Sequence, residues 1–304
     1  MKTVISTHFD PYFNLAWEEY IFKNIHQHED IFLLWQNSES IIIGRNQNVF
    51  EEVNLDYIVK NHIPLIRRNS GGGTVFHDLG NLNFTFMTDA KGKINNYQLM
   101  TEKLVSAFQA LGINLKFSGK SDLKIGELKV SGNAQYIYKD KLLHHGTLLF
   151  NSNLERLSNS LKSKTDDIES ISVKSNRSTV TNISSYTNLT MDELKKYLIQ
   201  ELTSNEFIEL TPKDLKRIEE LQVEKYQTYQ WNYGESPRSR IKKSKGIYSI
   251  DISLVYGNIE DAKIIKDGSL DLLLSSSIVG LRCYPSELSF LIKKAPEVYE
   301  MLFL

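Results

Sequence analysis

The chain has 304 residues, of which 41% are hydrophobic and 24% are charged, values typical of a folded globular protein. Its formal net charge of −1 excludes a strong overall field that would attract nucleic acid or an anionic membrane, so any basic site must be local. A single cysteine, Cys283, excludes an internal disulfide and a cysteine-cluster metal site. With no apolar targeting or membrane-spanning stretch in the sequence, we expect a cytoplasmic protein.

The first part of the chain predicts alternating strands and helices. Leu15, Phe22 and Ile25 share one face of a helix over residues 14–25, for which Asn14 is the expected N-cap. Short apolar runs predict strands, and stretches with helical spacing predict two further helices. The predicted strands cover residues 31–35, 40–44, 63–68, 74–78 and 81–87, and the helices cover residues 55–62 and 97–112.

The middle of the chain predicts more strands, then a loop, then two helices. The strands are joined by tight turns, and the loop is rich in Ser and Asn. Thr190 and Glu193 form a capping-box pattern for the first helix, and Pro212 is the first residue of the second. The predicted strands cover residues 113–119, 121–138 and 141–151, the loop covers residues 157–185, and the helices cover residues 191–203 and residues from 212 towards 225–234.

The end of the chain predicts a second, smaller unit. The basic stretch SPRSRIKKSKG predicts a linker over residues 236–246. A hairpin over residues 247–268 and two helical segments over residues 269–277 and 285–294 follow it. We therefore expect a mixed α+β domain over residues 1–241 and a small α/β domain over residues 246–304.

Three consecutive glycines stand out in RRNSGGGTVFHDLGNLNF, residues 67–84. Adjacent glycines allow a turn with positive φ, a close approach of backbone to a ligand, or a nest of N–H groups for an anion; a hairpin tip is the alternative without a ligand. The segment lacks the residues of a P-loop and does not open a helix. Arg67 and Arg68, which suit phosphate or carboxylate, precede the glycines with Ser70, and His77 follows them. This combination favours an anionic ligand lying against exposed backbone.

A second cluster lies near GELKVSGNAQ, residues 126–135, where Lys129 precedes a turn of small residues. A lysine beside a turn is ordinarily a surface residue. Asp122 is a lone carboxylate that either caps a turn or holds Mg²⁺, which needs only one or two carboxylates plus phosphate oxygens and water. His144 and His145 are neighbours in a strand, so at most one of them faces a shared site, and their spacing is not that of a zinc site.

Taken together, these segments resemble the lipoate–protein ligase family. RRNSGGGTVFHDLGNLNF (67–84), LKVSGNAQ (128–135) and HHGTLLFN (144–151) match the family's three signature segments in type, order and spacing. The resemblance extends over nearly the whole chain through weaker matches, which are PYFNLAWEEY (11–20), SIIIGRNQN (40–48), SDL (121–123) and WNYGESP (231–237).

The resemblance implies an α+β fold: a mixed-sheet catalytic domain shared with biotin and lipoate ligases, and a small α/β C-terminal accessory domain. It implies that lipoate attacks the α-phosphate of ATP to give lipoyl-adenylate, called lipoyl-AMP, and that a lysine ε-amine of an acceptor domain then displaces AMP. The implied cofactors are ATP and Mg²⁺, with lipoate as substrate. The implied acceptors are acyltransferase subunits of 2-oxoacid dehydrogenases and the glycine-cleavage H protein. We expect a monomer that binds neither nucleic acid nor a membrane.

The resemblance also implies roles for individual residues. Lys129 would stabilise the charge that develops between the lipoate carbonyl and the α-phosphate, and Asp122 would position Mg²⁺. The residues implied in binding ATP or lipoyl-AMP are Arg68, Asn69, Ser70, Gly71, Gly72, Gly73, Thr74, Val75, Phe76, His77, Asn81, Lys129, Ser131, Gly132 and Ala134. Those expected around lipoate are Leu15, Trp35, Gly44, Arg45, Asn46, His145 and Gly146.

Two positions depart from the pattern of some family members, which carry arginine where this chain has Asn69 and Tyr136. These departures concern how the anions are bound and leave the class unchanged. Two alternatives remain at this point. One is a lipoyl or octanoyl transferase without the adenylation step; the cysteine-dependent kind needs a thiol in the catalytic core, and Cys283 lies outside it. The other is a non-catalytic lipoate-binding module, against which the intact Lys129 and Asp122 argue.

Overall fold

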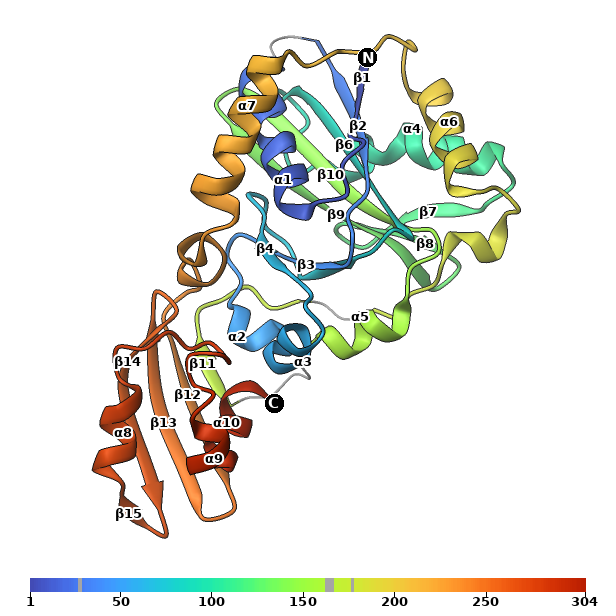
Figure 1. Ribbon diagram of the computed structural model, residues 1–304. Helices are drawn as coiled ribbons and strands as arrows, with labels where there is room; N and C mark the ends of the chain where they lie inside the picture. Colours follow the sequence, from blue (N-terminus) through green and yellow to red (C-terminus); the bar gives the residue numbers. More distant parts are fainter. Residues whose placement is uncertain (27–28, 162–166, 176–177) are drawn as a thin grey trace.

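A computed structural model gives the structure of residues 1–26, 29–161, 167–175 and 178–304. A seven-stranded sheet forms the centre of the larger part of the molecule (Figure 1). Its outer strands β1 and β2 are parallel, and its other neighbours are antiparallel. In spatial order the strands are β1 (Lys2–Ile5), β2 (Ile31–Trp35), β6 (Asn81–Asp89), β10 (Lys141–Leu149), β9 (Leu128–Tyr138), β8 (Asp122–Ile125) and β7 (Leu115–Ser118). The predicted mixed-sheet α+β architecture is confirmed.

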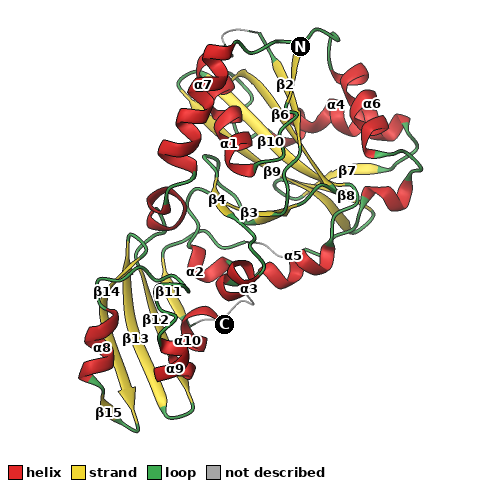
Figure 2. Cartoon of the chain, in the orientation of Figure 1, coloured by secondary structure: helices red, strands yellow, loops and turns green. Residues whose placement is uncertain are grey.

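Helices cover both faces of this sheet (Figure 2). Alternate residues of β2 explain the two layers: Phe32 and Leu34 join one hydrophobic cluster, and Leu33 and Trp35 join the other. The first cluster includes residues of α4 (Tyr97–Ala110) and α6 (Met191–Leu202). The second includes residues of α1 (Pro11–Tyr20), of its π-helical continuation η1 (Ile21–Ile25) and of α7 (Pro212–Leu221).

A three-stranded sheet, ordered β4-β3-β5, carries the glycines. Strand β3 (Ser40–Ile43) is parallel to β4 (Leu65–Arg67) on one side and antiparallel to β5 (Val75–His77) on the other. The triple-glycine segment connects the two outer strands, so it must cross the end of β3. Between β3 and β4 the chain forms α2 (Val49–Glu52) and α3 (Leu55–Lys60).

The N-cap predicted for the first helix is wrong. Helix α1 begins at Pro11, and the Asp10 carboxylate caps it by accepting a hydrogen bond from the Tyr12 backbone N–H. Asn14 is fully buried inside the helix, because its amide group binds backbone carbonyls outside it. The capping box of Thr190 and Glu193 is confirmed, and Pro212 opens α7 as predicted.

A five-stranded antiparallel sheet forms the C-terminal part, in the order β11-β12-β13-β14-β15. The linker predicted over residues 236–246 is wrong for residues 239–245, which form β12. Ile241 is buried there, while Arg240 and Lys242 point outward to Asp251 and Glu169, so the basic run is one face of a strand. The strands are β11 (Ile168–Ser170), β12 (Ser239–Lys245), β13 (Tyr248–Val255), β14 (Asn258–Lys266) and β15 (Ser269–Leu270).

Other elements differ from the sequence prediction in extent. The predicted loop over residues 157–185 contains β11, the end of α5 (Leu154–Ser160) and the 3₁₀ turn η2 (Ile183–Tyr186), while residues 162–166 and 176–177 lie outside the described residues. The helix predicted to begin at Pro212 and to run towards residues 225–234 is broken into α7 and the π-helical turns η3 (Gln222–Tyr226) and η4 (Gln230–Gly234). The two predicted C-terminal helical segments contain α8 (Leu272–Ile278) and α9 (Leu291–Lys294), and α10 (Pro296–Phe303), which follows them, was not predicted.

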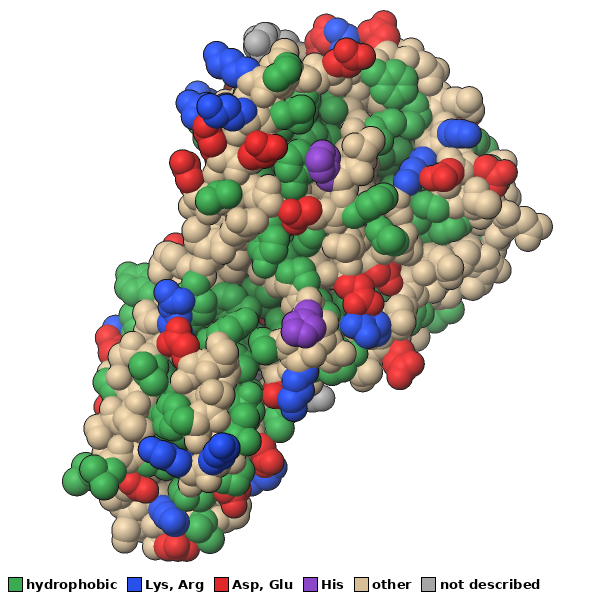
Figure 3. All heavy atoms as spheres, viewed as in Figure 1, with side chains coloured by type: hydrophobic (Ala, Val, Ile, Leu, Met, Phe, Trp, Pro, Cys, Tyr) green, Lys and Arg blue, Asp and Glu red, His purple; other side chains and the backbone are tan. Residues whose placement is uncertain are grey.

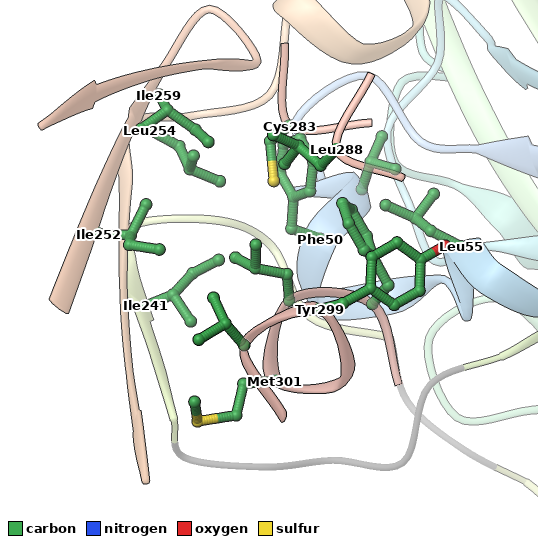
Figure 4. Packing of buried hydrophobic residues seen from close by; sticks show 14 of the residues in the cluster. Phe50, Leu55, Ile241, Ile252, Leu254, Ile259, Cys283, Leu288, Tyr299 and Met301 are labelled. Carbon is green, nitrogen blue, oxygen red and sulfur yellow. The ribbon is translucent and has the colours of Figure 1, made fainter. Parts of the chain in front are cut away.

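The C-terminal part shares its hydrophobic core with the rest of the chain. One cluster joins residues of β3, α2 and α3 to residues of β12, β13, β14 and α10. Figure 4 shows Phe50 and Leu55 lying against Tyr299, whose hydroxyl donates a 3.3 Å hydrogen bond to Asp56. On the surface, acidic and basic side chains are interspersed on the face shown in Figure 3. Across the described part of the chain, no helix combines the length and the apolar character needed to cross a membrane.

Candidate functional site

A cavity of about 560 Å³ lies between the seven-stranded sheet and the triple-glycine segment. It brings together residues that are far apart in the sequence and that the sequence analysis assigned to one site. The predicted residues that line it are Leu15, Trp35, Arg68, Gly72, Gly73, Thr74, Val75, His77, Asp122, Lys129, Gly132, Ala134, His145 and Gly146.

The cavity has one apolar end and one charged end, because its lining follows the order of the strands. Trp35 comes from β2, His145 from β10, Lys129 from β9 and Asp122 from β8. Strands β2 and β8 are four interstrand spacings apart, or about 19 Å at about 4.8 Å each. The apolar end is lined by Leu15, Trp35, Ile42 and Val75. The cations that line the charged end include Lys120, Lys129 and Lys174. Such a cavity suits a molecule with an apolar tail and an anionic head.

Lys129 and Asp122 form an ion pair of 2.9 Å in the cavity wall, and both side chains are about one-fifth exposed. Their strands β9 and β8 are neighbours. The Lys129 side chain lies over Gly132, where an added Cβ would come within 3.3 Å of its Cε and Nζ. The small residues after Lys129 therefore leave space for its ammonium group to reach the cavity.

Arg68 holds the triple-glycine segment from inside. It is 6% exposed, and its guanidinium donates hydrogen bonds to the carbonyl oxygens of Gly71 (2.6 Å), Gly73 (2.8 Å) and Ile42 (3.1 Å). Burial lowers its pKa to about 10, which leaves the group protonated at neutral pH. The segment is thus tied down by a cation, unlike the tip of a solvated hairpin.

Two glycines have a specific steric role in this arrangement. Gly72 has φ +88°, a conformation that side chains rarely adopt. A Cβ on Gly44, in the turn after β3, would lie 2.1 Å from the Gly72 carbonyl oxygen. Gly44 therefore allows the loop to cross the end of β3. Gly44 was predicted for the lipoate pocket, but it does not line the cavity because Gly72 lies against it.

Arg67 points away from the cavity, as the alternation of a strand predicts. It is fully buried and donates to backbone carbonyls in the turn after β3, including those of Gly44 (3.0 Å) and Gln47 (2.8 Å), and to the carbonyl of Asn232 (3.0 Å) in η4. Burial lowers its pKa to about 9. Arg67 therefore connects the three-stranded β4-β3-β5 sheet to η4, the last turn of the helical segment that begins with α7.

Ser70 supports the cavity wall without lining it. Its hydroxyl donates to His145 Nε2 at 2.6 Å, and His145 Nδ1–H donates to the Glu18 carboxylate at 2.9 Å. Ser70 is 1% exposed, and its oxygen also accepts from Arg68 Nε at 3.0 Å. This chain of bonds fixes the orientation of the His145 ring. Glu18 was not predicted from the sequence, although it lies in the weakly matching segment 11–20.

His77 lies beside Trp35, with ring centroids 6.1 Å apart and nearly perpendicular planes. Its Nδ1 accepts hydrogen bonds from the side-chain amides of Asn37 (3.1 Å) and Asn83 (3.5 Å). Burial, with the charge of Arg68 adding to it, lowers the pKa of His77 to about 3, so the ring is neutral. His144, by contrast, faces the other side of the sheet and packs near Phe84 and Phe86.

Asn69 points away from the cavity into a buried polar cluster. Its side chain donates to Glu19 (3.0 Å) and to the Tyr226 hydroxyl (2.7 Å), and it accepts from Lys225 (2.8 Å). Lys225 also pairs with Glu19 at 2.7 Å. Asn69 therefore lies in a polar cluster with Lys225 of η3 and does not line the cavity.

The remaining predicted residues lie around the cavity rather than in its lining. Arg45 pairs with Glu235 at 2.7 Å, and the Asn46 carbonyl accepts from the backbone N–H of Val173. Phe76 is part of the hydrophobic core. The predicted residues outside the lining are Asn69, Ser70, Gly71, Phe76, Asn81, Ser131, Gly44, Arg45 and Asn46.

The cavity wall also contains a segment that the sequence predicted only as a loop. Val173, Lys174 and Ser175 line the cavity, and Ser175 Oγ accepts from the Thr74 backbone N–H (2.9 Å) and from Gln47 Nε2 (3.0 Å). Nothing in the local sequence indicates that this segment returns to the glycines. Lys120 and Ser121, in the turn before Asp122, were missed as well.

Comparison with known proteins gives a consistent result. A model of the lipoyl protein ligase A/B catalytic domain matches residues 10–203. Lipoate–protein ligase 1 of Staphylococcus aureus (strain Mu50) is 42% identical over 268 residues, which cover 85% of this chain and 82% of that protein.

Solved structures give the same result. The structure of a lipoate–protein ligase A bound with ATP is 29% identical, with a TM-score of 0.66, and the match covers 77% of this chain and 100% of that one. The structure of a bi-partite lipoate protein ligase and its E2 lipoyl domain from Thermoplasma acidophilum is 28% identical, with a TM-score of 0.68 and coverages of 81% and 98%. The chain belongs to the lipoyl protein ligase A/B catalytic-domain family.

Proposed function

We propose that this protein is an ATP-dependent lipoate–protein ligase that makes lipoyl-AMP in the cavity and then transfers the lipoyl group to a lysine of a lipoyl domain. The observation that carries the proposal is the single cavity that joins an apolar end to a charged end containing Lys129 and Asp122. A relative named lipoate–protein ligase and a related ATP-bound ligase support the same chemistry.

In the first reaction, a carboxylate oxygen of lipoate attacks the α-phosphorus of ATP, and the bond from that phosphorus to the bridging oxygen breaks to release pyrophosphate. Both reactants are anions, so they repel each other unless the site neutralises them. The Lys129 ammonium lies at the charged end and would stabilise the negative charge on both groups as the anhydride forms. The apolar end would hold the tail of lipoate and so fix the position of its carboxylate.

In the second reaction, the ε-amine of the acceptor lysine attacks the carbonyl carbon of lipoyl-AMP, an amide bond forms and AMP leaves. Lys129 would stabilise the carbonyl oxygen as negative charge develops on it. The backbone of Gly72 and Gly73, which lines the cavity, would lie along the adenylate. Because Arg68 holds the loop by two carbonyl oxygens, its position would be fixed before the ligand binds.

Asp122 is the only carboxylate among the described residues that line the cavity. Mg²⁺ usually binds through one or two protein carboxylates together with phosphates and water, so this lone carboxylate fits such an ion. When bound, Mg²⁺ would neutralise phosphate charge beside Lys129. Asp122 would hold the ion, because its side chain is about one-fifth exposed and lines the cavity.

The acceptors that we propose are lipoyl domains of 2-oxoacid dehydrogenase acyltransferase subunits and the H protein of glycine cleavage. The related bi-partite ligase from Thermoplasma acidophilum, which is described together with its E2 lipoyl domain, supports this class. The proposal also includes action as a monomer in the cytoplasm.

A labelling experiment tests the proposed function against the alternatives. Purified protein is mixed with a lipoyl domain and given either lipoate with ATP and Mg²⁺ or synthetic lipoyl-AMP, and acceptor modification is measured by mass spectrometry. A ligase modifies the acceptor in both mixtures. Modification from lipoyl-AMP alone would contradict the proposal and favour a transferase, and no modification in either mixture would favour a lipoate-binding module.

A further inference from the structure

Gln47, in the turn after β3, connects three parts of the cavity wall, although it is not among the described residues that line the cavity. Its side chain is fully buried, and its Oε1 accepts hydrogen bonds from the Gly44 backbone N–H and from the Thr74 hydroxyl, both at 3.0 Å. Its Nε2 donates to Ser175 Oγ at 3.0 Å. The amide therefore joins the turn itself, the end of the triple-glycine segment and the segment 173–175.

The orientation of this amide follows from its partners. A backbone N–H can only donate, so the Gln47 atom that faces the N–H of Gly44 is the oxygen. The amide nitrogen must then face Ser175, and because an amide nitrogen only donates, Ser175 Oγ is the acceptor.

The Ser175 hydroxyl has its accepting positions filled and its hydrogen free. A hydroxyl oxygen carries two lone pairs and one hydrogen. The lone pairs of Ser175 accept from Gln47 Nε2 (3.0 Å) and from the Thr74 backbone N–H (2.9 Å). Within the described part of the chain, no residue accepts the hydroxyl hydrogen. Because the side chain is half-buried and lines the cavity, this hydrogen can reach a ligand there.

The position of Ser175 is fixed before any ligand binds. Its backbone N–H donates to the Glu52 carboxylate at 2.9 Å, and the N–H of Val173 donates to the Asn46 carbonyl at 3.2 Å. Gly73 lies directly against the hydroxyl, since a Cβ added there would come within 3.0 Å of Ser175 Oγ. The third glycine of the segment therefore leaves the space that this hydroxyl occupies.

Ser175 lies where the proposed function places the nucleotide. The adenylate would extend along Gly72 and Gly73, and Ser175 Oγ lies beside Gly73. Further along the chain, the Thr179 carbonyl accepts from the backbone N–H of Lys129 at 2.9 Å, so the chain is held at the charged end as well. The AMP part of a nucleotide offers acceptors along its whole length, in its phosphate oxygens, its ribose oxygens and the ring nitrogens of adenine.

We propose that Gln47 is a positioning residue that turns the Ser175 hydroxyl towards the cavity, where Ser175 donates a hydrogen bond to an acceptor atom of the AMP part of the nucleotide. This inference rests on the proposed function and adds the pair of residues that contributes this bond. Because both lone pairs of Ser175 Oγ are occupied, the hydroxyl donates to the nucleotide and does not accept from it.

The test is a double-mutant cycle on lipoate-dependent pyrophosphate release, in which kcat and the KM values for ATP and lipoate are measured. In Gln47→Glu the new carboxylate accepts the Ser175 hydrogen and so removes it from the nucleotide, and Ser175→Ala removes the hydroxyl itself. Each variant should raise KM for ATP about tenfold and leave kcat and KM for lipoate near the wild-type values. The double variant should be no worse than the single ones, because all three lose the same bond.

Gln36→Glu is the matched control. Gln36 also has a buried side chain, whose amide donates to the Leu79 carbonyl at 2.6 Å, and it is not among the described residues that line the cavity. This variant should keep the wild-type KM for ATP.

Losses that multiply in the double variant, to about a hundredfold, would show that Gln47→Glu acts independently of Ser175 and would overturn the inference. Ser175→Ala covers the case in which Gln47→Glu does not fold, because Ser175 is only half-buried. An unchanged KM for ATP in this variant would be sufficient to overturn the inference. A wild type that releases no pyrophosphate with lipoate would instead contradict the proposed function.

Discussion

Glu19 lies behind the triple-glycine segment and illustrates how single residues stabilise the site. Its carboxylate is 5% exposed and accepts hydrogen bonds from Lys225 (2.7 Å), Lys23 (2.5 Å) and the Tyr226 hydroxyl (2.6 Å). Burial by itself raises the pKa of Glu19, but the attraction of Lys225 and these hydrogen bonds outweigh burial and bring it to about 2. The ionised carboxylate therefore stabilises the fold and positions Asn69 at the start of the loop.

This pKa predicts how stability depends on pH. The folded value of about 2 lies below the ordinary value of 4.5, so the unfolded state takes up the proton first as the pH falls. The stabilisation is complete above the ordinary value and is lost towards the folded value, a change of about 3 kcal/mol in the free energy of unfolding. Urea unfolding at several pH values should show that Glu19→Gln is less stable than the wild type at neutral pH and that the difference narrows in acid.

The control for this prediction is Glu219→Gln, since Glu219 is exposed on α7. This variant should follow the wild type over the whole pH range. A Glu19→Gln variant whose deficit stays constant down to acid pH would show that the carboxylate is not ionised by its neighbours.

At this scale, the sequence predicted the residues whose type is informative. Three adjacent glycines, two arginines and a lysine before small residues were enough to select Arg68, Gly72, His77 and Lys129, all of which line the cavity. Residues whose role depends on a distant partner were missed. Glu18 is one, because it supports the cavity through His145, 127 positions away in the sequence.

Helix α1 shows how one element carries several parts of the site. It contributes Leu15 to the cavity, Glu18 to the His145 ring and Asn14 to a chain of hydrogen bonds that passes through Asn37 to His77. Its start is fixed by Asp10, whose carboxylate caps the helix and accepts a further hydrogen bond from Gln222 Nε2 at 2.7 Å. The position of the helix therefore affects the apolar end of the cavity and the orientation of the His145 ring in its wall.

The cap gives a prediction at the scale of the element. Asp10→Ala should lower the free energy of unfolding by about 1 kcal/mol, because the Tyr12 backbone N–H loses its partner. Asp10→Ser, which can still accept that hydrogen bond, should recover most of the loss. Thermal unfolding of the three proteins measures the effect, and equal stability of the alanine and serine variants would rule out a capping role.

Element boundaries were the part of the fold that the sequence predicted least well. The basic run of β12 looked like a linker because its outward residues are charged, whereas only Ser239 and Ile241 alternate inward against the core. The partner strand β11 has three residues in a Ser/Asn-rich stretch and forms only by pairing with β12. Long-range pairing of this kind leaves little trace in local sequence. The capping box at Thr190 was predicted correctly because its partner lies three residues away, and Pro212 marked the start of α7 for an equally local reason.

At the scale of the whole molecule, the two parts of the chain are joined by a hydrophobic core rather than by a linker. Phe50 of α2 is 1% exposed and belongs to the cluster that includes Ile241, Ile252 and Met301 of the C-terminal part. A small sheet whose inner face packs on the larger part buries surface that neither part could bury alone. We therefore expect the two parts to depend on each other for stability.

Phe50→Ala tests this dependence. Removing a buried phenylalanine should cost about 3–5 kcal/mol, and the loss should reach the C-terminal sheet as well. Hydrogen exchange should be faster in β13 and β14 of the variant, although neither strand is mutated. Phe9→Ala, at a side chain that is 47% exposed, should leave exchange unchanged in both parts. Unaltered protection of β13 in Phe50→Ala would mean that the parts fold independently.

The central claim is that Lys129 allows two anions to join in this cavity, and ATP–pyrophosphate exchange measures that reaction directly. The wild type should show exchange that requires lipoate, and Lys129→Ala should lower its rate about 100-fold or more, since a group that stabilises transition-state charge is removed. Lys116→Ala, on the exposed face of β7, should exchange like the wild type. Exchange that persists near the wild-type rate in a folded Lys129→Ala protein would contradict the account.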